Sequence, residues 1–276
     1  MLGTLFTGLV AVAAAYFVYN KFFKKLQIAP KPEPYKKDYK KDVVYLYQFK
    51  RAQNLPNLSP FCLKVESFLR VAKIPYEVCD DKLIWSRNGA MPFVELNGEH
   101  IADSDLIEHI LGKHFNIPSL PAKQEAQAQA LSKLVDYHLF NILNRFKIME
   151  DEFFLGFLEF LSIPKLLHPI VLPVLTKLFY TKIYTRSKMA IGDFDPEDLD
   201  QLLQRDLQVI KEYLGDQKFL FGDKLYPIDA TVFGHLATVY YPFRNHFCNV
   251  IEKDFPSILE YLERVRHEIY PNDFTI

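Results

Sequence analysis

The stretch from residue 43 to residue 78 constrains the fold most, because it predicts a strand, a helix and a second strand in close succession. Residues 43–49 are rich in β-branched and aromatic side chains, which is typical of a strand. Residues 62–71 carry apolar side chains three and four positions apart, as on one face of a helix. Residues 75–78 again favour a strand. This spacing predicts a right-handed crossover between two parallel strands, and therefore an α/β domain.

The loop that leads into this helix is the first candidate site. Ser59 ends the loop, Pro60 suits the first helical position because its missing N–H costs nothing there, and Cys62 lies one turn into the helix. Unpaired backbone N–H groups and the helix dipole stabilise the anionic form of a hydroxyl or thiol at such a position. Ser59 and Cys62 are therefore the candidate catalytic residues. The alternative for Cys62 is a small apolar side chain buried beneath the helix.

The next part of the chain predicts the rest of the same domain. Asn97-Gly98 is a strong signal for a two-residue hairpin between antiparallel strands. Asp103 and Ser104 precede a helix predicted over residues 105–112, and an acid with a hydroxyl at such a position is first of all a helix cap. Ligand binding by the same two side chains is an additional interpretation.

These motifs resemble those of the glutathione transferase superfamily. Ser59-Pro60-Phe61-Cys62 is similar to the thioredoxin-like active-site turn. Residues 91–98 are similar to the third strand, the hairpin turn and the start of the fourth strand, and residues 101–107 to the acidic-serine turn that holds the γ-glutamyl end of glutathione. The resemblance covers roughly residues 43–270. It is closest to the failed axon connections and metaxin-like branch, which includes the nematode cadmium-responsive (cadmium-inducible lysosomal) proteins.

The resemblance implies an α/β thioredoxin-like domain over residues 43–115 and an all-α transferase-like domain over residues 122–276. It also implies a cis peptide bond before Pro92. Glutathione, as co-substrate, would be bound by Met91, Pro92, Asp103 and Ser104. Ser59 would donate a hydrogen bond to the glutathione sulfur and favour its thiolate form.

The end of the first predicted strand bears on which residue faces the sulfur. In tyrosine-type transferases a tyrosine lies near this position. The strand register here places Gln48 there and turns Tyr47 to the other face of the sheet. Ser59 is therefore favoured as the group that faces the thiol, with Cys62 as the second candidate.

The C-terminal half predicts helices, with apolar residues three and four positions apart over residues 131–146 and 199–214. Residues 153–184 are strongly apolar but are interrupted by Pro164, Pro169 and Pro173. The prolines argue against a second transmembrane span, because a straight helix of that length is not expected. Two interpretations stay open for this segment. It is a helix pair that closes the core, which is favoured, or a surface that lies on a membrane or a partner.

The N-terminal segment predicts a membrane anchor. Residues 2–19 are nearly all apolar, lysines follow them, and no charged side chain precedes them. This run of roughly 18 residues is near the short end of the range that spans a bilayer, and a secretory signal has the opposite order of charge. We therefore expect a transmembrane helix over residues 1–20 and a basic linker rich in Pro and Lys over residues 21–42. The positive-inside rule then places the folded domain in the cytoplasm. The alternatives are a cleaved signal and a buried N-terminal helix.

Composition argues against several classes of function. The net charge of −1 gives no indication of a nucleic-acid partner. The three cysteines, Cys62, Cys79 and Cys248, are too few and too scattered to indicate a disulfide framework or a thiolate metal cage. No metal site is therefore predicted.

Two functions from different classes remain. The first is a membrane-anchored, glutathione transferase-like enzyme that joins glutathione to a small electrophile in detoxification or a stress response. The second is a non-catalytic, metaxin-like scaffold that uses the same cleft to hold a partner. The resemblance also implies a homodimer or a membrane assembly, a lysosomal or other endomembrane location, and a role in the cadmium response.

Overall fold

The protein is described by a computed structural model that covers residues 30–275, apart from residues 53, 81–83 and 161–162. The chain divides into two units, Met1–Pro32 and Glu33–Ile276, and the sheet and the labelled helices belong to the second. The transmembrane helix predicted over residues 1–20 lies outside the described residues.

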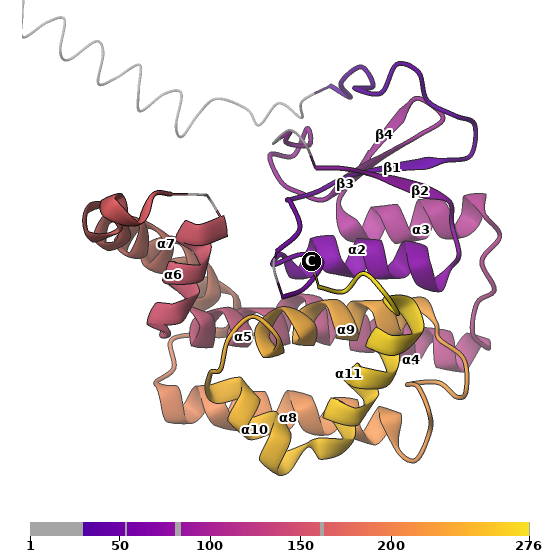
Figure 1. The fold of residues 1–276 in the computed structure, drawn as a ribbon. Helices are drawn as coiled ribbons and strands as arrows, with labels where there is room; N and C mark the ends of the chain where they lie inside the picture. The colour runs from indigo at the N-terminus through magenta and orange to yellow at the C-terminus, as the bar shows by residue number, and fades with distance from the viewer. Residues whose placement is uncertain (1–29, 53, 81–83, 161–162, 276) are drawn as a thin grey trace, which may run out of the picture. The chain divides into compact units, whose positions relative to one another are not determined.

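A four-stranded sheet forms one layer of the second unit (Figure 1). Its strands lie in the order β2-β1-β3-β4, where β1 is Val44–Tyr47, β2 is Tyr76–Cys79, β3 is Phe93–Leu96 and β4 is Glu99–Ala102. β1 and β2 are parallel, and the other two pairs are antiparallel. The predicted crossover and the hairpin at Asn97-Gly98 are both confirmed. Both turn residues have positive φ, 51° and 81°, as the favoured two-residue hairpin turn requires.

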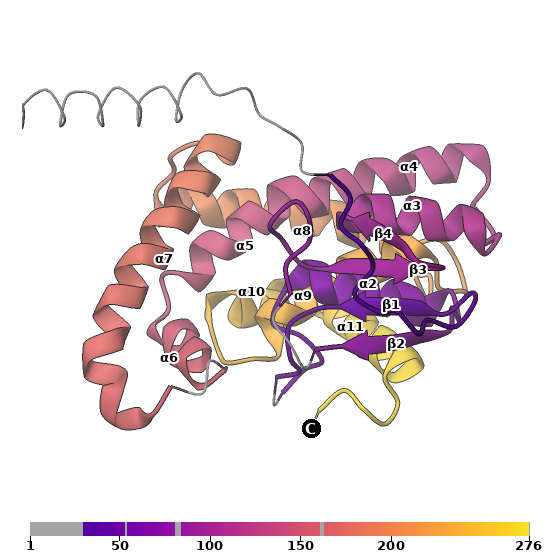
Figure 2. The same ribbon diagram turned by 90° about the horizontal axis from the view of Figure 1, so that it is seen from above.

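Two helices, α2 (Pro60–Val71) and α3 (Ser104–His114), cover one face of this sheet (Figures 1 and 2). The alternation of the strands explains which side chains meet them, because every second residue of a strand points to the same face. Val44 and Leu46 of β1 pack with Val65 and Phe68 of α2 in one buried cluster. The N-terminal thioredoxin-like arrangement is therefore built as the resemblance implied.

The other face of the sheet is covered by the segment that precedes β1. The ring of Tyr35 lies 5.8 Å from Tyr47 and 5.9 Å from Phe93, measured between centroids. The backbone N–H groups of Tyr35 and Lys36 donate to the buried Glu95 carboxylate at 2.7 and 3.0 Å. The prediction of a solvated linker up to residue 42 is therefore wrong at its C-terminal end, because this segment supplies donors and an aromatic ring to the sheet.

The remaining elements are helical, which confirms the all-α class of the second domain. They are α4 (Ala122–Lys133), the π-helical turn η1 (Leu134–Leu139), α5 (Phe140–Lys147), α6 (Asp151–Phe160), the 3₁₀ turn η2 (Lys165–Leu167), α7 (His168–Ile191), α8 (Pro196–Leu214), α9 (Pro227–Tyr240), α10 (His246–Asp254) and α11 (Pro256–Ile269). α9 is the central helix, since every residue from 228 to 239 is buried.

Close packing of α2 on α9 joins the two domains. A Cβ atom at Gly234 of α9 would lie 2.7 Å from the backbone nitrogen of Lys64, so only glycine allows this approach. The Lys64 side chain is fully buried, and its Nζ lies 2.7 Å from Asp136, 3.1 Å from Asp105 and 3.6 Å from Glu108. Burial by itself lowers the pKa of Lys64, but the three carboxylates outweigh burial and raise it above its ordinary value. The amine is therefore charged and paired inside the interface.

The segment over residues 153–184 differs from the favoured prediction. α7 is one continuous helix of 24 residues, with Pro169 in its first turn and Pro173 inside it. Proline is tolerated near a helix start, where the first N–H groups lack intrahelical partners. Most of the outward side of α7 is exposed, so the interpretation as part of the core is wrong for this helix. Within the described residues, Lys165–Ile191 is long and apolar enough to cross a membrane by length and composition, which is weak evidence for a span.

Candidate functional site

A cavity of about 940 Å³ lies between the loops of the thioredoxin-like domain and helices α5 to α7. Five of the six predicted site residues line it: Ser59, Met91, Pro92, Asp103 and Ser104. They come from three loops that are far apart in sequence. The Met91–Pro92 peptide bond is cis, as the resemblance implied. The expected juxtaposition of Ser59 with Pro92 across one cavity is therefore present.

Ser59 is the N-cap residue of α2. Its backbone is extended, with φ −83° and ψ 122°, and its Oγ accepts a hydrogen bond from Cys62 N at 3.5 Å. Asn57 fixes the loop behind it, because its Oδ1 accepts from Ser59 N at 3.0 Å while its Nδ2 donates to Phe49 O at 2.8 Å. The capping contact uses a lone pair of the hydroxyl oxygen. The hydroxyl proton can therefore be donated to a ligand that enters the cavity.

Cys62 does not belong to the cavity. Its side chain is fully buried, and it is absent from the residues that line the space. Burial raises the pKa of the thiol to about 12, against the lowering effect of the Ser59 hydrogen bond. A thiolate is therefore not available at neutral pH. The prediction of Cys62 as a catalytic residue is wrong, and the alternative of a small buried side chain describes it.

Asp103 and Ser104 differ in their surroundings although they are neighbours. Asp103 is exposed and has φ 85° and ψ 132°, and its side chain makes no capping hydrogen bond, so the prediction of an acidic cap is wrong. A non-glycine residue in such a conformation costs on the order of 1–3 kcal/mol, and such residues cluster at ligand-binding sites. Ser104 is buried as the first residue of α3. The strained turn thus presents a carboxylate and a helix N-terminus to one cavity.

Tyr47 lies outside the cavity, as its register predicts, and Gln48, which the register placed at the tyrosine position, does not line the cavity either. Tyr47 is buried on the outer face of the sheet, where its hydroxyl donates to Glu95 Oε2 at 3.0 Å. Gln48 Nε2 donates to Glu66 Oε2 at 2.7 Å. Within the described residues, the cavity therefore has no tyrosine that could take the place of Ser59.

The individual residues that form the apolar half of the cavity were not identified from the sequence. This side is lined by phenylalanine and aliphatic side chains from α2, α5, α6 and α7: Phe61, Phe140, Phe153, Leu155, Phe179 and Ile183. The apolar periodicity of these helices gave the signal for burial, but not for burial against a cavity. This wall suits an apolar ligand beside the polar turn that carries Asp103.

Lys147, at the end of α5, is a second feature that sequence reasoning missed. It lines the cavity but is only 7% exposed, and its Nζ lies 3.5 Å from Thr238 Oγ1, its hydrogen-bond partner in the described part of the chain. Burial lowers the pKa of this amine from 10.5 to about 8. A buried cation without a carboxylate partner is costly, so an anionic group on a ligand would stabilise it. The only sequence signal was a lysine beside an apolar helical stripe.

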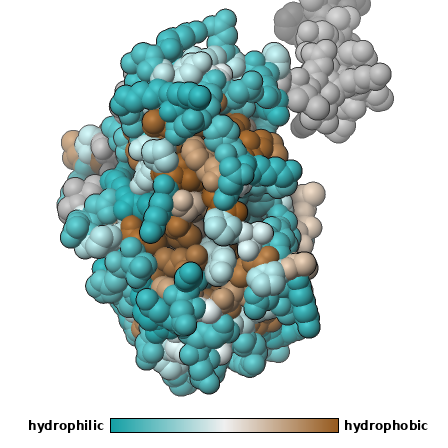
Figure 3. Space-filling model, turned by 90° about the vertical axis from the view of Figure 1, so that its right-hand side faces the viewer, coloured by the Kyte–Doolittle hydropathy of each residue, from teal (hydrophilic) through white to brown (hydrophobic). Residues whose placement is uncertain are grey.

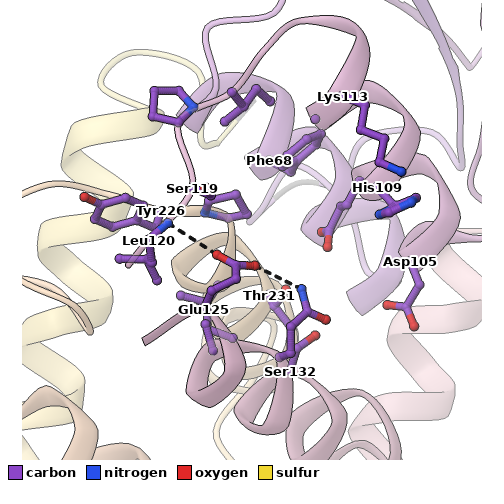
Figure 4. Close-up of a pocket in the computed structure, with 18 of the residues that line it drawn as sticks. Phe68, Asp105, His109, Lys113, Ser119, Leu120, Glu125, Ser132, Tyr226 and Thr231 are labelled. Atoms are coloured by element: carbon purple, nitrogen blue, oxygen red, sulfur yellow. Dashed lines mark hydrogen bonds between the residues drawn. The ribbon is translucent and has the colours of Figure 1, made fainter. Parts of the chain in front are cut away.

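A second cavity of about 540 Å³ contains none of the predicted site residues. It lies among α3, α4 and the start of α9, and Figure 4 shows Asp105, His109, Glu125 and Tyr226 around it. Glu125 is already engaged there, because its carboxylate accepts hydrogen bonds from Leu120 N and Gln129 Nε2, both at 3.3 Å.

On the side of the molecule that Figure 3 shows, hydrophobic residues gather along the middle between hydrophilic margins.

Comparisons with known proteins agree with this geometry. Models of the glutathione S-transferase N-terminal and C-terminal domains match residues 60–153 and 203–265. Failed axon connections of Drosophila melanogaster is 30% identical over 268 residues, which cover 88% of this chain and 62% of that protein. Metaxin-2 of Homo sapiens is 24% identical over 81% of this chain and 87% of its own length. A glutathione S-transferase of Ceriporiopsis subvermispora, solved in complex with glutathione, has the same fold, with a TM-score of 0.56 at 15% identity over 84% of this chain and 100% of that chain.

Proposed function

Because the chain belongs to the glutathione transferase superfamily, in the branch of failed axon connections and the metaxins, we propose that it binds glutathione in the cavity around Ser59 and joins it to a small electrophile. The observation that carries this proposal is that Ser59, Met91, Pro92, Asp103 and Ser104 line one cavity, with the Met91–Pro92 bond cis. The chain spans 62% of the length of failed axon connections, so nothing is taken from that protein as a whole.

Each side chain has a distinct role in this proposal. The Asp103 carboxylate pairs with the ammonium group at the γ-glutamyl end of glutathione, and Ser104 with the start of α3 binds the adjacent carboxylate. The backbone at Met91 holds the tripeptide in an extended form. The Ser59 hydroxyl donates a hydrogen bond to the sulfur and stabilises the thiolate, which is the attacking nucleophile. The protein thus supplies orientation and charge stabilisation, and glutathione supplies the reactive atom.

The apolar wall opposite this turn would hold the electrophile. Phe61, Phe140 and Ile183 offer apolar surface, and Lys147 offers a buried positive charge close by. An apolar electrophile that carries an anionic group would satisfy both features. The thiolate sulfur would form a bond to the electron-poor carbon while the bond from that carbon to its leaving group breaks and the leaving group departs with the electron pair, and Lys147 would pair with the anionic group that stays on the electrophile.

Retention of the protein on immobilised glutathione tests this function directly. The fragment should begin at Glu33, because Tyr35 and Lys36 donate hydrogen bonds to Glu95 of the sheet, and it should be passed over immobilised glutathione. Loss of a charge-assisted hydrogen bond in Asp103→Ala should weaken retention by about tenfold or more. Asp216→Ala is the matched control, because Asp216 is exposed and does not line the cavity, and this variant should bind like the wild type. Failure of the wild-type fragment to bind would count against glutathione.

Ser59→Ala separates binding from chemistry. The variant should keep most of its retention on glutathione, because the sulfur contact is one of several. Conjugation to a model electrophile should fall by about a hundredfold, the scale on which a donor to a developing or reactive anion contributes. Ser119→Ala, which lies outside this cavity, is the control for the same chemical change.

We also propose that residues 1–20 anchor the protein as a single-pass membrane protein whose folded domain faces the cytoplasm. The support is the uncharged apolar run at residues 2–19 followed by lysines. By resemblance the membrane is lysosomal or another endomembrane, and the response to cadmium is the stress to examine first. Alkaline extraction should leave the full chain in the membrane pellet, and protease outside intact organelles should digest the folded domain. Release into the supernatant would contradict the anchor.

A second function, a non-catalytic scaffold in a membrane assembly, is favoured by two observations. The chain is similar to Metaxin-2 over 87% of that protein, and the outer side of α7 is exposed. In that case the cavity would hold a segment of a partner and not glutathione. A fragment that neither binds glutathione nor conjugates it, but still folds, would support the scaffold.

A further inference from the structure

An apolar stripe runs along the outer side of α7 and begins in the 3₁₀ turn η2 that precedes it. Leu166 of η2 and Ile170, Val174 and Leu178 of α7 are spaced by four residues and are 87%, 70%, 60% and 65% exposed. Residues spaced in this way lie one above the other on an α-helix, so the three side chains of α7 form one continuous surface, and Leu166 lies just before it in the chain. Isolated exposed leucines are common on soluble proteins, but a contiguous apolar stripe marks an interaction surface.

The opposite side of α7 holds the helix in the unit. It packs against α5 and α6, Phe179 and Ile183 line the cavity, and Ser187 is fully buried. Figures 1 and 2 both show α6 and α7 at one side of this unit, away from the sheet. The apolar stripe is therefore not needed to attach α7, and its position at the edge leaves it accessible.

The charged side chains of residues 163–191, which include α7, are all basic. Residues 163–191 contain five basic side chains and no aspartate or glutamate: Lys165, Lys177, Lys182, Arg186 and Lys188. Lys188 pairs with Asp193, and Arg186 lies over the ring of Phe140. Lys177 and Lys182 are exposed and form no salt bridge within the described residues. The apolar stripe is thus accompanied by positive charge that its own helix does not neutralise.

We propose that α7 lies on the anionic lipid surface of a membrane, with Leu166, Ile170, Val174 and Leu178 among the acyl chains and Lys177 and Lys182 at the headgroups. A basic helix with an accessible apolar stripe has the composition of helices that lie in the membrane interface. A second copy of this chain is a poorer occupant, because a twofold contact along α7 would bring the same lysines together. This docking does not depend on glutathione binding.

The docking has a structural consequence for the cavity. The same helix presents Phe179 and Ile183 to the cavity and its outer stripe to the lipid, so the cavity wall and the membrane contact are separated by one helix. The helix is about 10 Å across. Apolar ligands dissolved in the membrane would therefore be concentrated within a short distance of the cavity.

Vesicle flotation of the fragment Glu33–Ile276 tests the proposal without the N-terminal segment. This fragment is a compact unit that contains the sheet and the core helices. It should float with vesicles of phosphatidylcholine and phosphatidylserine, and bind much less to phosphatidylcholine alone or at high salt. Ile170→Glu with Val174→Glu should reduce binding at least about tenfold. Val209→Glu, at an exposed apolar position on α8, is the matched control and should bind normally.

Charge variants give an independent measurement. Lys177→Gln and Lys182→Gln should each weaken binding about fivefold, whereas Lys224→Gln and Lys253→Gln, also exposed, should not. The substitutions are at exposed positions, and circular dichroism should show unchanged folding. No flotation with either vesicle, or equal binding by the α7 and α8 variants, would overturn the proposal. A dimer in gel filtration that Ile170→Glu dissociates would also overturn it, in favour of a second copy.

Discussion

Lys147→Met should make the protein more stable, although it removes a charged residue from the wall of the cavity. The wild-type amine is buried, and its hydrogen-bond partner in the described residues is Thr238 Oγ1 at 3.5 Å. Methionine keeps the length and flexibility of the aliphatic stem, so the packing cost should be below about 1.5 kcal/mol. The substitution removes the desolvated charge and little else.

The magnitude follows from the pKa of the amine. Burial lowers this pKa from 10.5 to about 8. At 1.36 kcal/mol per pKa unit, the difference corresponds to about 3 kcal/mol of destabilisation when the amine is protonated. Below about pH 8 both the folded and unfolded chains carry the proton, so the whole cost applies. Between about pH 8 and 10.5 the unfolded chain binds more protons than the folded chain, so stability rises with pH and the cost disappears.

Urea unfolding measures the effect. At neutral pH the variant should be about 2 kcal/mol more stable than the wild type, after the packing cost is subtracted. Near pH 9.5 the cost of the wild-type charge falls to about 1 kcal/mol, which is similar to the packing cost, so the advantage of the variant should nearly vanish. Lys123→Met, at an exposed position on α4, is the control and should show no such pH dependence. The claim that Lys147 is a buried charge without an ion-pair partner would be refuted if Lys147→Met were less stable than the wild type at neutral pH. It would also be refuted if the stability difference between the two did not change with pH.

Three further predictions concern other buried groups. Lys64→Met should destabilise the fold by about 3–5 kcal/mol, because it leaves the Asp136 and Glu108 carboxylates without their cation, whereas Asp105 keeps its ion pair with Lys133; a loss below about 1 kcal/mol in urea unfolding would contradict the buried ion pairs. Gly234→Ala should cost at least about 1–3 kcal/mol, because its Cβ would meet the backbone of α2, and an unchanged melting temperature would count against that contact. Cys62→Ala should lower stability by about 1 kcal/mol and leave conjugation unchanged, whereas loss of activity with normal folding would restore a catalytic role for the thiol.

The parts of the fold that were predicted depend on local signals. The β1–α2–β2 crossover follows from the β-branched and aromatic residues of 43–49 and the helical spacing of apolar residues over 62–71, and the hairpin from Asn97-Gly98. The position of Ser59 at the start of α2 follows from the proline after it. The grouping of Ser59 with Pro92 came from the resemblance, because nothing local to either residue brings them together.

The errors arose where distant residues decide the outcome. Tyr35 contacts Glu95 sixty residues later in the chain, and a linker rich in lysine gives no sign of that contact. The backbone conformation of Asp103 depends on the turn between β4 and α3, whereas sequence offered only its suitability as a cap. For α7, the apolar content was clear, but the same content suits a core or a surface. Only the packing of the neighbouring helices distinguishes the two.

Isothermal titration of reduced glutathione into the fragment Glu33–Ile276 tests the central claim most directly, because it measures binding without an electrophile or a membrane. The account predicts saturable binding that Asp103→Ala weakens by about tenfold or more, while Asp216→Ala leaves it unchanged. Absence of binding by the folded wild-type fragment, or equal affinity in Asp103→Ala, would contradict the assignment of this cavity to glutathione.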